Sequence, residues 1–323
     1  MRIALTGGRG FIGRNLQIRL QEVGHTDLVL IPHDADFAQT VALLADVDVV
    51  FHLAGVNRPK DPADFVSGNH GFTRMLCSAM GAQPNPPRAV YASSTQASLD
   101  NPYGRSKRQA EDELLAYAER TGATAHFFRL TNVFGKWSRP NYNSAVATFC
   151  HNIARGEPIT VNDPSSPLQL IYVDDVVQHF IALLEDKASP SGLLNAGPEY
   201  QTTVGALVEQ IHAFHASRDN LISERVGTGL ARALYATYVS FLPPSAFQYT
   251  VARHADPRGV FVEMLKTPDC GQFGYFTAFP GITRGEHYHH TKTEKFLVIK
   301  GTARFGYRHI ITNESHEVIS TGG

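Results

Sequence analysis

The first thirteen residues, MRIALTGGRGFIG, decide the fold of the N-terminal part of the chain. The apolar run Ile3–Leu5 predicts a short buried strand, a glycine-rich segment follows at Gly7–Gly13, and a helix is predicted over Phe11–Val23. Glycines let the backbone turn tightly and approach a pyrophosphate, which then faces the N–H groups at the start of the helix. This order of strand, glycine loop and helix predicts a dinucleotide-binding site.

Apolar segments then alternate with helical ones. The further predicted strands are Asp27–Ile31, Val47–Leu53, Ala89–Ala92 and Ala125–Leu130, and the predicted helices are Val41–Leu44, Phe72–Met80 and Pro102–Arg120, the last stopped by Gly122. Nearly continuous apolar strands between helices are typical of a parallel sheet that is covered on both faces. The expected fold is therefore α/β, a doubly wound parallel sheet of the Rossmann type.

After Gly135 the pattern loosens, with helical segments near Ala145–Arg155 and Tyr172–Leu184 and a last helix that reaches Leu242. Pro243–Pro244 breaks the pattern, so we expect one domain over residues 1–243 and a second over 244–323. The second has short β-like runs, at Val260–Leu265, Gly274–Phe279, Lys295–Ile299 and Ala303–Tyr307. These runs predict a small all-β barrel or sandwich.

Composition excludes several classes of protein. The 323 residues contain 29 basic and 30 acidic side chains, which argues against a nucleic-acid binder. The sequence contains no apolar run long enough for a membrane span and no signal-peptide pattern. Cys77, Cys150 and Cys270 are too scattered for a disulfide framework or a zinc knuckle. We expect a cytoplasmic protein.

A second cluster of polar residues lies in the predicted helix that begins at Pro102. Tyr103 and Lys107, four residues apart, lie on one helix face, and Ser94 ends the preceding strand, with Ser93 as the alternative serine. A lysine ammonium beside a phenol favours the phenolate, and a serine hydroxyl can bond a substrate carbonyl. Alone, the Tyr/Lys spacing is more typical of an exposed helix face; together with the glycine loop and the serines it predicts a proton-transfer site.

These motifs, with His52-Leu53-Ala54-Gly55, resemble the extended short-chain dehydrogenase/reductase family. The resemblance implies that Tyr103 is the general acid, that Lys107 lowers its pKa and holds the nicotinamide ribose, and that Ser94 polarises the carbonyl. It implies a UDP-sugar substrate, bound by Ser94, Asn132 and Asn143. Read without the family, Asn132 is equally a strand-end residue that satisfies local backbone.

The cofactor residues implied are Gly7, Arg9, Gly10, Phe11, Ile12, Gly13, Asp34, Leu53, Ala54, Gly55, Tyr103 and Lys107. Arg9 is placed to meet the 2′-phosphate of NADP(H), whereas Asp34, after the second strand, is near where NAD ribose is bound. We expect NADP(H), with NAD as the alternative. Sugar dehydratases of this family carry an acidic pair after the serine position, and Thr95-Gln96 stands there instead. Ketone reduction or 4-epimerisation is therefore favoured over dehydration.

The second domain contains a metal-ligand pattern. Gly281, His287, His289, Glu294 and Gly301 follow the spacing G-x5-H-x-H-x4-E-x6-G. On a strand, residues two apart share a face, so His287, His289 and Glu294 form a ligand set suited to zinc or another divalent metal. His290 would point away. The pattern resembles the first motif of the cupin family, whose second motif is missing here, so we expect a truncated cupin with three protein ligands.

A short-chain reductase followed by a cupin resembles the bifunctional enzymes of capsular polysaccharide biosynthesis. This resemblance implies a cupin that epimerises C3 of a UDP-4-keto-6-deoxy-N-acetylhexosamine and a reductase that then reduces C4 with NADPH, toward UDP-N-acetyl-L-fucosamine. Epimerisation must come first, because the C4 ketone acidifies the C3–H bond. We also expect a homodimer. The alternatives are a single-function 4-epimerase or reductase with a structural cupin and, less favoured, a dinucleotide sensor, which commonly lacks the Tyr/Lys pair.

Overall fold

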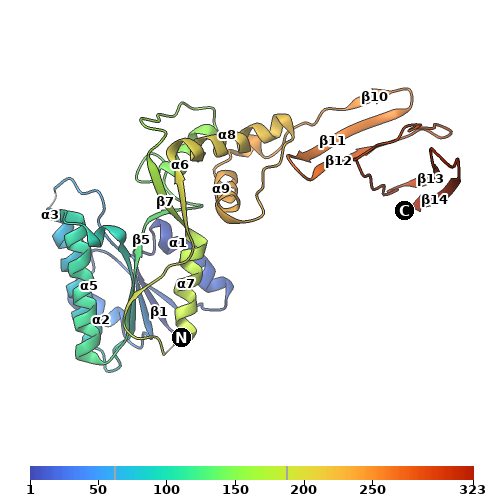
Figure 1. Ribbon diagram of the computed structural model, residues 1–323. Coiled ribbons are helices and arrows are strands. Elements are labelled where there is room, and N and C mark those ends of the chain that lie inside the picture. The colour runs from blue at the N-terminus through green and yellow to red at the C-terminus, as the bar shows by residue number, and fades with distance from the viewer. Residues whose placement is uncertain (62, 187) are drawn as a thin grey trace. The chain divides into compact units, whose positions relative to one another are not determined.

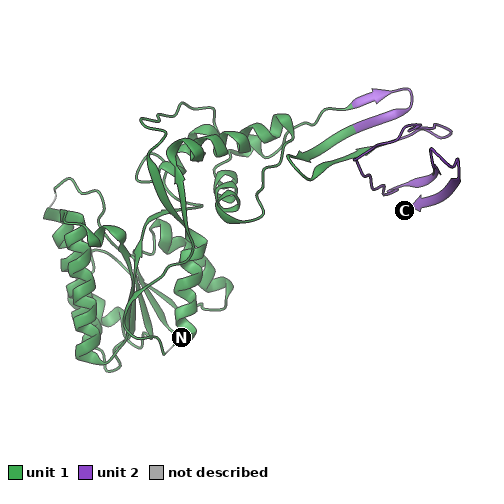
Figure 2. Cartoon of the chain, viewed as in Figure 1, with its two compact units in different colours: residues 1–253, 262–275 green, residues 254–261, 276–323 purple. Residues whose placement is uncertain are grey.

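The computed structural model describes residues 1–61, 63–186 and 188–323. The chain forms two compact units, one of Met1–Arg253 with Val262–Tyr275 and the other of His254–Phe261 with Phe276–Gly323 (Figure 2). The domain boundary expected after residue 243 stays a prediction. None of the helices in the described ranges is both long enough and apolar enough to cross a membrane.

The first unit is built on a parallel sheet with the strand order β2-β1-β3-β4-β5-β8 (Figure 1). Its strands are β1 (Ile3–Thr6), β2 (Leu28–Ile31), β3 (Val49–His52), β4 (Arg88–Ser94), β5 (Ala125–Leu130) and β8 (Gly192–Leu194). The predicted doubly wound α/β fold is confirmed.

Helices cover both faces of this sheet because successive strand residues point to opposite sides. Leu5 packs in one apolar core with helices α1 and α7, whereas its neighbour Ala4 joins a second core with α2, α4 and α5. The helical elements of this layer are α1 (Phe11–Glu22), α2 (Phe37–Leu43), α3 (Ala63–Phe65), the π-helix η1 (Val66–Gly71), α4 (Phe72–Gly81), the 3₁₀ turn η2 (Thr95–Ser98), α5 (Pro102–Thr121) and α7 (Val173–Glu185).

Local signals set the ends of the longest helix, α5. Asn101 caps its first turn by accepting a hydrogen bond from Gly104 N at 2.8 Å, and Pro102 occupies the first helical position. Gly122 ends it in the left-handed conformation, with φ at +75°. Helix α2 instead begins four residues before the expected start, because Asp36 and Gln39 form a capping box.

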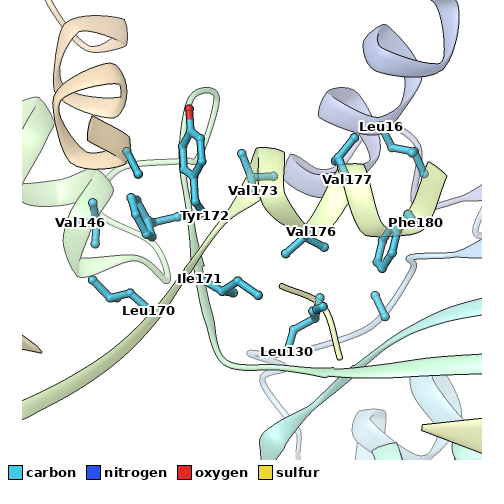
Figure 3. Packing of buried hydrophobic residues seen from close by; sticks show 14 of the residues in the cluster. Leu16, Leu130, Val146, Leu170, Ile171, Tyr172, Val173, Val176, Val177 and Phe180 are labelled. Carbon is cyan, nitrogen blue, oxygen red and sulfur yellow. The ribbon is translucent and has the colours of Figure 1, made fainter. Parts of the chain in front are cut away.

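A second, smaller sheet continues the first unit, in the order β6-β7-β9. Its strands are β6 (Asn132–Phe134), β7 (Pro167–Tyr172) and β9 (Glu199–Thr203), and α6 (Ala145–Ile153), α8 (Val204–Asn220) and α9 (Gly229–Ser240) accompany them. Figure 3 shows Ile171 of β7 beside Val176 of α7 and Leu130 of β5. One apolar core therefore joins the two sheets and fixes the carboxyl end of β5, where Asn132 follows.

The rest of the chain is β-rich. After the 3₁₀ turn η3 (Pro244–Ala246), the strands are β10 (His254–Asp256), β11 (Gly259–Thr267), β12 (Gly271–Phe276), and the antiparallel pair β13 (Gly301–Arg308) and β14 (Ser315–Gly322). The predicted all-β character is confirmed in outline. The strand expected at Lys295–Ile299 is wrong: Leu297 and Ile299 are 85% and 72% exposed, and an apolar run without a partner strand forms no ladder.

A buried histidine, His52, holds the ends of β1 and β3 together. Thr6 Oγ1 accepts hydrogen bonds from the N–H groups of Leu53 and Ala54, both at 3.1 Å, so its own proton goes to His52 Nδ1 at 2.7 Å. The other ring nitrogen lies 2.8 Å from Thr73 Oγ1. The imidazole is therefore neutral with its proton on Nε2, and burial lowers its pKa to about 3, with the Lys107 charge adding to the effect.

We expect acid to destabilise the first unit through His52. Between pH 6.5 and 5 the unfolded chain binds a proton that the folded chain does not, so the free energy of unfolding falls by about 1.4 kcal/mol per pH unit from this residue. His52→Gln can bond both threonines but does not titrate. Urea unfolding, followed by the fluorescence of the single tryptophan, Trp137, measures the free energy of unfolding. The difference in this free energy between wild type and variant should be ~2 kcal/mol smaller at pH 5 than at pH 7.

The exposed His33 offers the control. His33→Gln should run parallel to wild type over this pH range. If the gap between wild type and His52→Gln is constant from pH 7 to pH 5, the neutral buried imidazole is ruled out.

Candidate active site

The glycine loop lies between β1 and α1, as predicted, and close backbone approaches explain its glycines. Gly7 has φ at +66°, and a Cβ on it would lie 2.6 Å from Ala54 N. A Cβ on Gly13 would lie 2.4 Å from Gly7 O. Gly10 is the N-cap of α1 and brings no side chain over the first-turn N–H groups. The loop is therefore shaped to bring a phosphate against backbone.

The other expected cofactor residues lie around this loop at the carboxyl ends of β1, β2 and β3. Arg9 and Asp34 are exposed, Phe11 and Ile12 begin α1, and Leu53 and Ala54 are tied to β1 through Thr6. Asp34 Oδ1 lies 3.7 Å from His33 Nδ1. The structure brings Gly55 to Lys107, because a Cβ on Gly55 would lie 3.1 Å from Lys107 Nζ.

Helix α5 presents Tyr103 and Lys107 to the end of β4. Lys107 is 5% exposed, its Nζ donates to Ala92 O at 3.0 Å, and it lies 6.0 Å from the centre of the Tyr103 ring. Burial lowers the pKa of Lys107 to about 8, and the nearby Glu111 carboxylate opposes this shift. Burial raises the pKa of Tyr103, against the effect of the Ser94 hydroxyl.

The pKa of Tyr103 is therefore raised in this structure, and the expected lowering of this pKa by Lys107 is not observed. The phenol is half-buried, and removing a phenolate from water raises the pKa by more than the Ser94 hydroxyl lowers it. Tyr103 stays protonated, which suits a proton donor. Of the two candidate serines, Ser94 interacts with Tyr103, whereas the Ser93 hydroxyl donates to Glu111.

Asn69, in the π-helix η1, is a site residue that the sequence analysis missed. Its amide accepts from Val56 N at 2.8 Å and donates to Val56 O and to Ser106 Oγ, both at 3.0 Å. Ser106 Oγ in turn donates to Tyr103 O at 2.8 Å. A π-turn breaks the 3.6-residue period, so no helical pattern points to a buried Asn69. It links the loop after β3 to the helix of Tyr103 and Lys107.

The two expected substrate asparagines lie on neighbouring segments. Asn132, at the start of β6, is exposed, and its Nδ2 donates to Gln169 O of the neighbouring strand β7 at 3.0 Å. Asn143 is also exposed, and the preceding Tyr142 hydroxyl lies 3.3 Å from Asn57 Oδ1. The Asn143 segment thus meets the loop that continues from Gly55, but within the described residues no hydrogen bond joins either asparagine to Tyr103 or Lys107.

The predicted metal ligands lie together in the second unit. His287 Nε2 is 3.2 Å from His289 Nε2, which is 3.8 Å from Glu294 Oε2, and one ligand atom from each lies within 4.8 Å of the others. They belong to an irregular segment and not to the expected strand. Lys292 Nζ, 2.7 Å from Glu294 Oε1, lowers the pKa of Glu294 and keeps it ionised. Two imidazoles and a carboxylate suit zinc.

Two other histidines of this unit, His309 and His316, make contacts of their own. His309 Nδ1 accepts from Thr312 N at 3.1 Å, and His316 Nε2 lies 3.2 Å from Glu314 Oε1. Neither joins the cluster of His287, His289 and Glu294 in the described residues.

Comparison with known proteins matches both parts of the chain. Residues 3–197 match the model of the NAD dependent epimerase/dehydratase family, and residues 254–323 match the polysaccharide biosynthesis C-terminal domain. The chain is 52% identical over 322 residues to UDP-2-acetamido-2,6-beta-L-arabino-hexul-4-ose reductase of Pseudomonas aeruginosa, an alignment that covers 100% of this chain and 87% of the relative.

Solved structures agree. The capsular polysaccharide assembling protein CapF from Staphylococcus aureus superposes with a TM-score of 0.90 at 38% identity, covering 100% of this chain and 88% of CapF. MoeE5 in complex with UDP-glucuronic acid and NAD, at 21% identity, covers 74% of this chain and 98% of its own with a TM-score of 0.64, and supports the fold alone. With more than half of its residues matched by the family model, the chain belongs to the NAD-dependent epimerase/dehydratase family.

Proposed function

We propose that the chain is a nucleotide-sugar oxidoreductase that reduces the C4 ketone of a UDP-4-keto-6-deoxy-N-acetylhexosamine with NADPH. The observation that carries this is the grouping of Tyr103, Lys107 and Ser94 at the end of β4, beside the glycine loop of β1. The 52% identical relative, named as a reductase of a UDP-linked hexul-4-ose, supports the substrate class.

The chemistry follows from the protonation states of the site. When bound, the nicotinamide cofactor supplies a hydride to C4. The Ser94 hydroxyl bonds the carbonyl oxygen, and Tyr103 Oη donates its proton to that oxygen. Burial raises the pKa of Tyr103, so the phenol is protonated before the reaction. Lys107 then stabilises the phenolate through its buried ammonium.

The second unit would act before the reductase. We propose that it epimerises C3 while the C4 ketone still acidifies the C3–H bond, and that His287, His289 and Glu294 hold a zinc or other divalent ion there. The product would lie on the route to UDP-N-acetyl-L-fucosamine for a surface polysaccharide. The expected cytoplasmic location and homodimer stay predictions.

Tyr103→Phe tests the reductase proposal. Loss of the general acid should lower NADPH oxidation with the UDP-4-keto sugar by roughly 10²–10⁴-fold while NADPH binding is retained. Tyr117→Phe is the matched control, because Tyr117 is buried on the same helix and its hydroxyl donates to Pro87 O at 2.6 Å, away from the Tyr103 and Lys107 side chains. Undiminished ketone reduction by Tyr103→Phe would disprove the assignment.

Cofactor choice rests on Arg9. In the described part of the chain Arg9 forms no ion pair, and Asp34 instead lies beside His33, which leaves the guanidinium free for a 2′-phosphate. We expect NADPH to bind more tightly than NADH, and Arg9→Ala to weaken NADPH by about 10- to 100-fold, the usual worth of a charge-assisted hydrogen bond, with little change for NADH. Equal losses for both, or tighter NADH binding in the wild type, contradict the choice.

The proposed role of the second unit predicts separable defects. His287→Ala and His289→Ala should abolish both zinc binding, measured by calorimetry, and C3 hydrogen exchange of the UDP-4-keto sugar in D₂O, while ketone reduction persists. His290→Ala removes an adjacent imidazole outside the cluster and should keep all three. A wild-type chain that reduces the ketone without ever exchanging C3 hydrogen is the single-function enzyme with a structural cupin.

A further inference from the structure

Glu111 is a buried acid that the proposed mechanism leaves without a role. It lies on α5 one turn beyond Lys107, as Lys107 lies one turn beyond Tyr103, so the three share a helix face. Glu111 is 3% exposed. A buried carboxylate is costly unless it is paired and hydrogen-bonded, so its partners are informative.

Those partners come from both strands beside the helix. Arg129 of β5 binds the carboxylate through both ends of its guanidinium, with Nε 3.1 Å from Oε1 and Nη2 2.7 Å from Oε2. The Ser93 hydroxyl of β4 donates to Oε1. Arg129 Nη1 also donates to Ser98 Oγ, at 3.2 Å, in the turn after Ser94. The carboxylate therefore joins β4, β5 and α5 at the residue next to Ser94.

The charge of Glu111 also acts on Lys107. The titratable groups around the Lys107 ammonium are Tyr103 and Glu111 on α5, Tyr91 on β4, whose ring centre is 4.8 Å away, and His52 on β3. Tyr91 and His52 are neutral, since burial raises the pKa of Tyr91 and lowers that of His52. Glu111 is thus the one anion among these groups that opposes the loss of the lysine proton.

We propose that Glu111 is a positioning residue of the reductase site, which fixes the Ser94 end of β4 against α5 through Ser93 and Arg129 and places a carboxylate one helical turn from Lys107. The proposal rests on the reductase function proposed above. It assigns no contact between Glu111 and the substrate, because Ser93 and Arg129 occupy its carboxylate.

Glu111→Gln tests the electrostatic part, since glutamine keeps the shape and removes the charge. The pKa of Lys107, about 8 in the wild type, should fall further. The alkaline limb of kcat/KM for the UDP-4-keto sugar with the NADPH-bound enzyme should therefore move about one pH unit toward acid. The rate should fall about tenfold more at pH 8.5 than at pH 6. Glu119→Gln, the same change at an exposed site on the same helix, should leave the profile unchanged.

Ser93→Ala tests the tether alone, because it cuts the bond to β4 and keeps the charge. It should lower kcat several-fold with an unmoved alkaline limb, and Ser93→Thr, which restores the hydroxyl, should rescue it. Loss by the same factor at every pH in Glu111→Gln, or an unchanged kcat in Ser93→Ala, overturns the proposal. If Glu111→Gln fails to fold, the comparison of Ser93→Ala with Ser93→Thr still tests the proposal.

Wild-type turnover separates the two proposals. If the wild type does not reduce the UDP-4-keto sugar, the reductase function fails, and Glu111 is then judged by the pH dependence of the NADPH dissociation constant. We expect the Glu111→Gln variant to lose NADPH affinity at a lower pH than wild type, because the family resemblance implies that Lys107 holds the nicotinamide ribose. Identical pH profiles for NADPH binding would overturn the role of Glu111.

Discussion

The buried ammonium of Lys107 imposes the strictest constraint on the first unit. An ammonium in a side chain that is only 5% exposed needs polar or charged groups close by. Here Ala92 O accepts a hydrogen bond from it, the Tyr91 ring centre lies 4.8 Å away, and the Glu111 carboxylate favours its charged form. Ala92 and Tyr91 both belong to β4, so these two contacts require α5 to pack on β4 at one register. Gly104 lets α5 come close to the turn η2 that follows β4, since a Cβ on it would lie 2.2 Å from Gln96 O.

A series of buried hydrogen bonds connects helix α5 to the end of β1 and the loop after β3. Ser106 Oγ donates to Tyr103 O and accepts from the side chain of Asn69. The Asn69 side chain accepts from Val56 N, and Asn69 O accepts from the hydroxyl of Thr73, which also bonds His52 Nε2. His52 Nδ1 bonds the hydroxyl of Thr6, whose oxygen accepts from the N–H groups of Leu53 and Ala54 in the loop after β3. Each member has its hydrogen-bond role fixed by its neighbours, so the two ends of the site are positioned before any ligand arrives.

The second unit is organised differently. Its predicted ligands lie close together because His287, His289 and Glu294 are near in sequence, and no distant strand is needed to assemble them. Large apolar side chains of this unit are exposed to solvent, among them Leu297 at 85% and Ile311 at 82%. Local spacing therefore sets this cluster, whereas the reductase site depends on packing between β3, β4 and α5.

The sequence by itself determined the features that depend on local periodicity and backbone chemistry. These are the doubly wound sheet, the glycine loop at Gly7–Gly13, the helix that pairs Tyr103 with Lys107, and the short spacing of the histidines. It did not predict Asn69 or the bond between Glu111 and Arg129, and it placed a strand at Lys295–Ile299 where none forms. Only the tertiary structure decided these, because the partner of a buried polar group, or of a strand, comes from residues distant along the chain, and pattern along one segment carries no information about them.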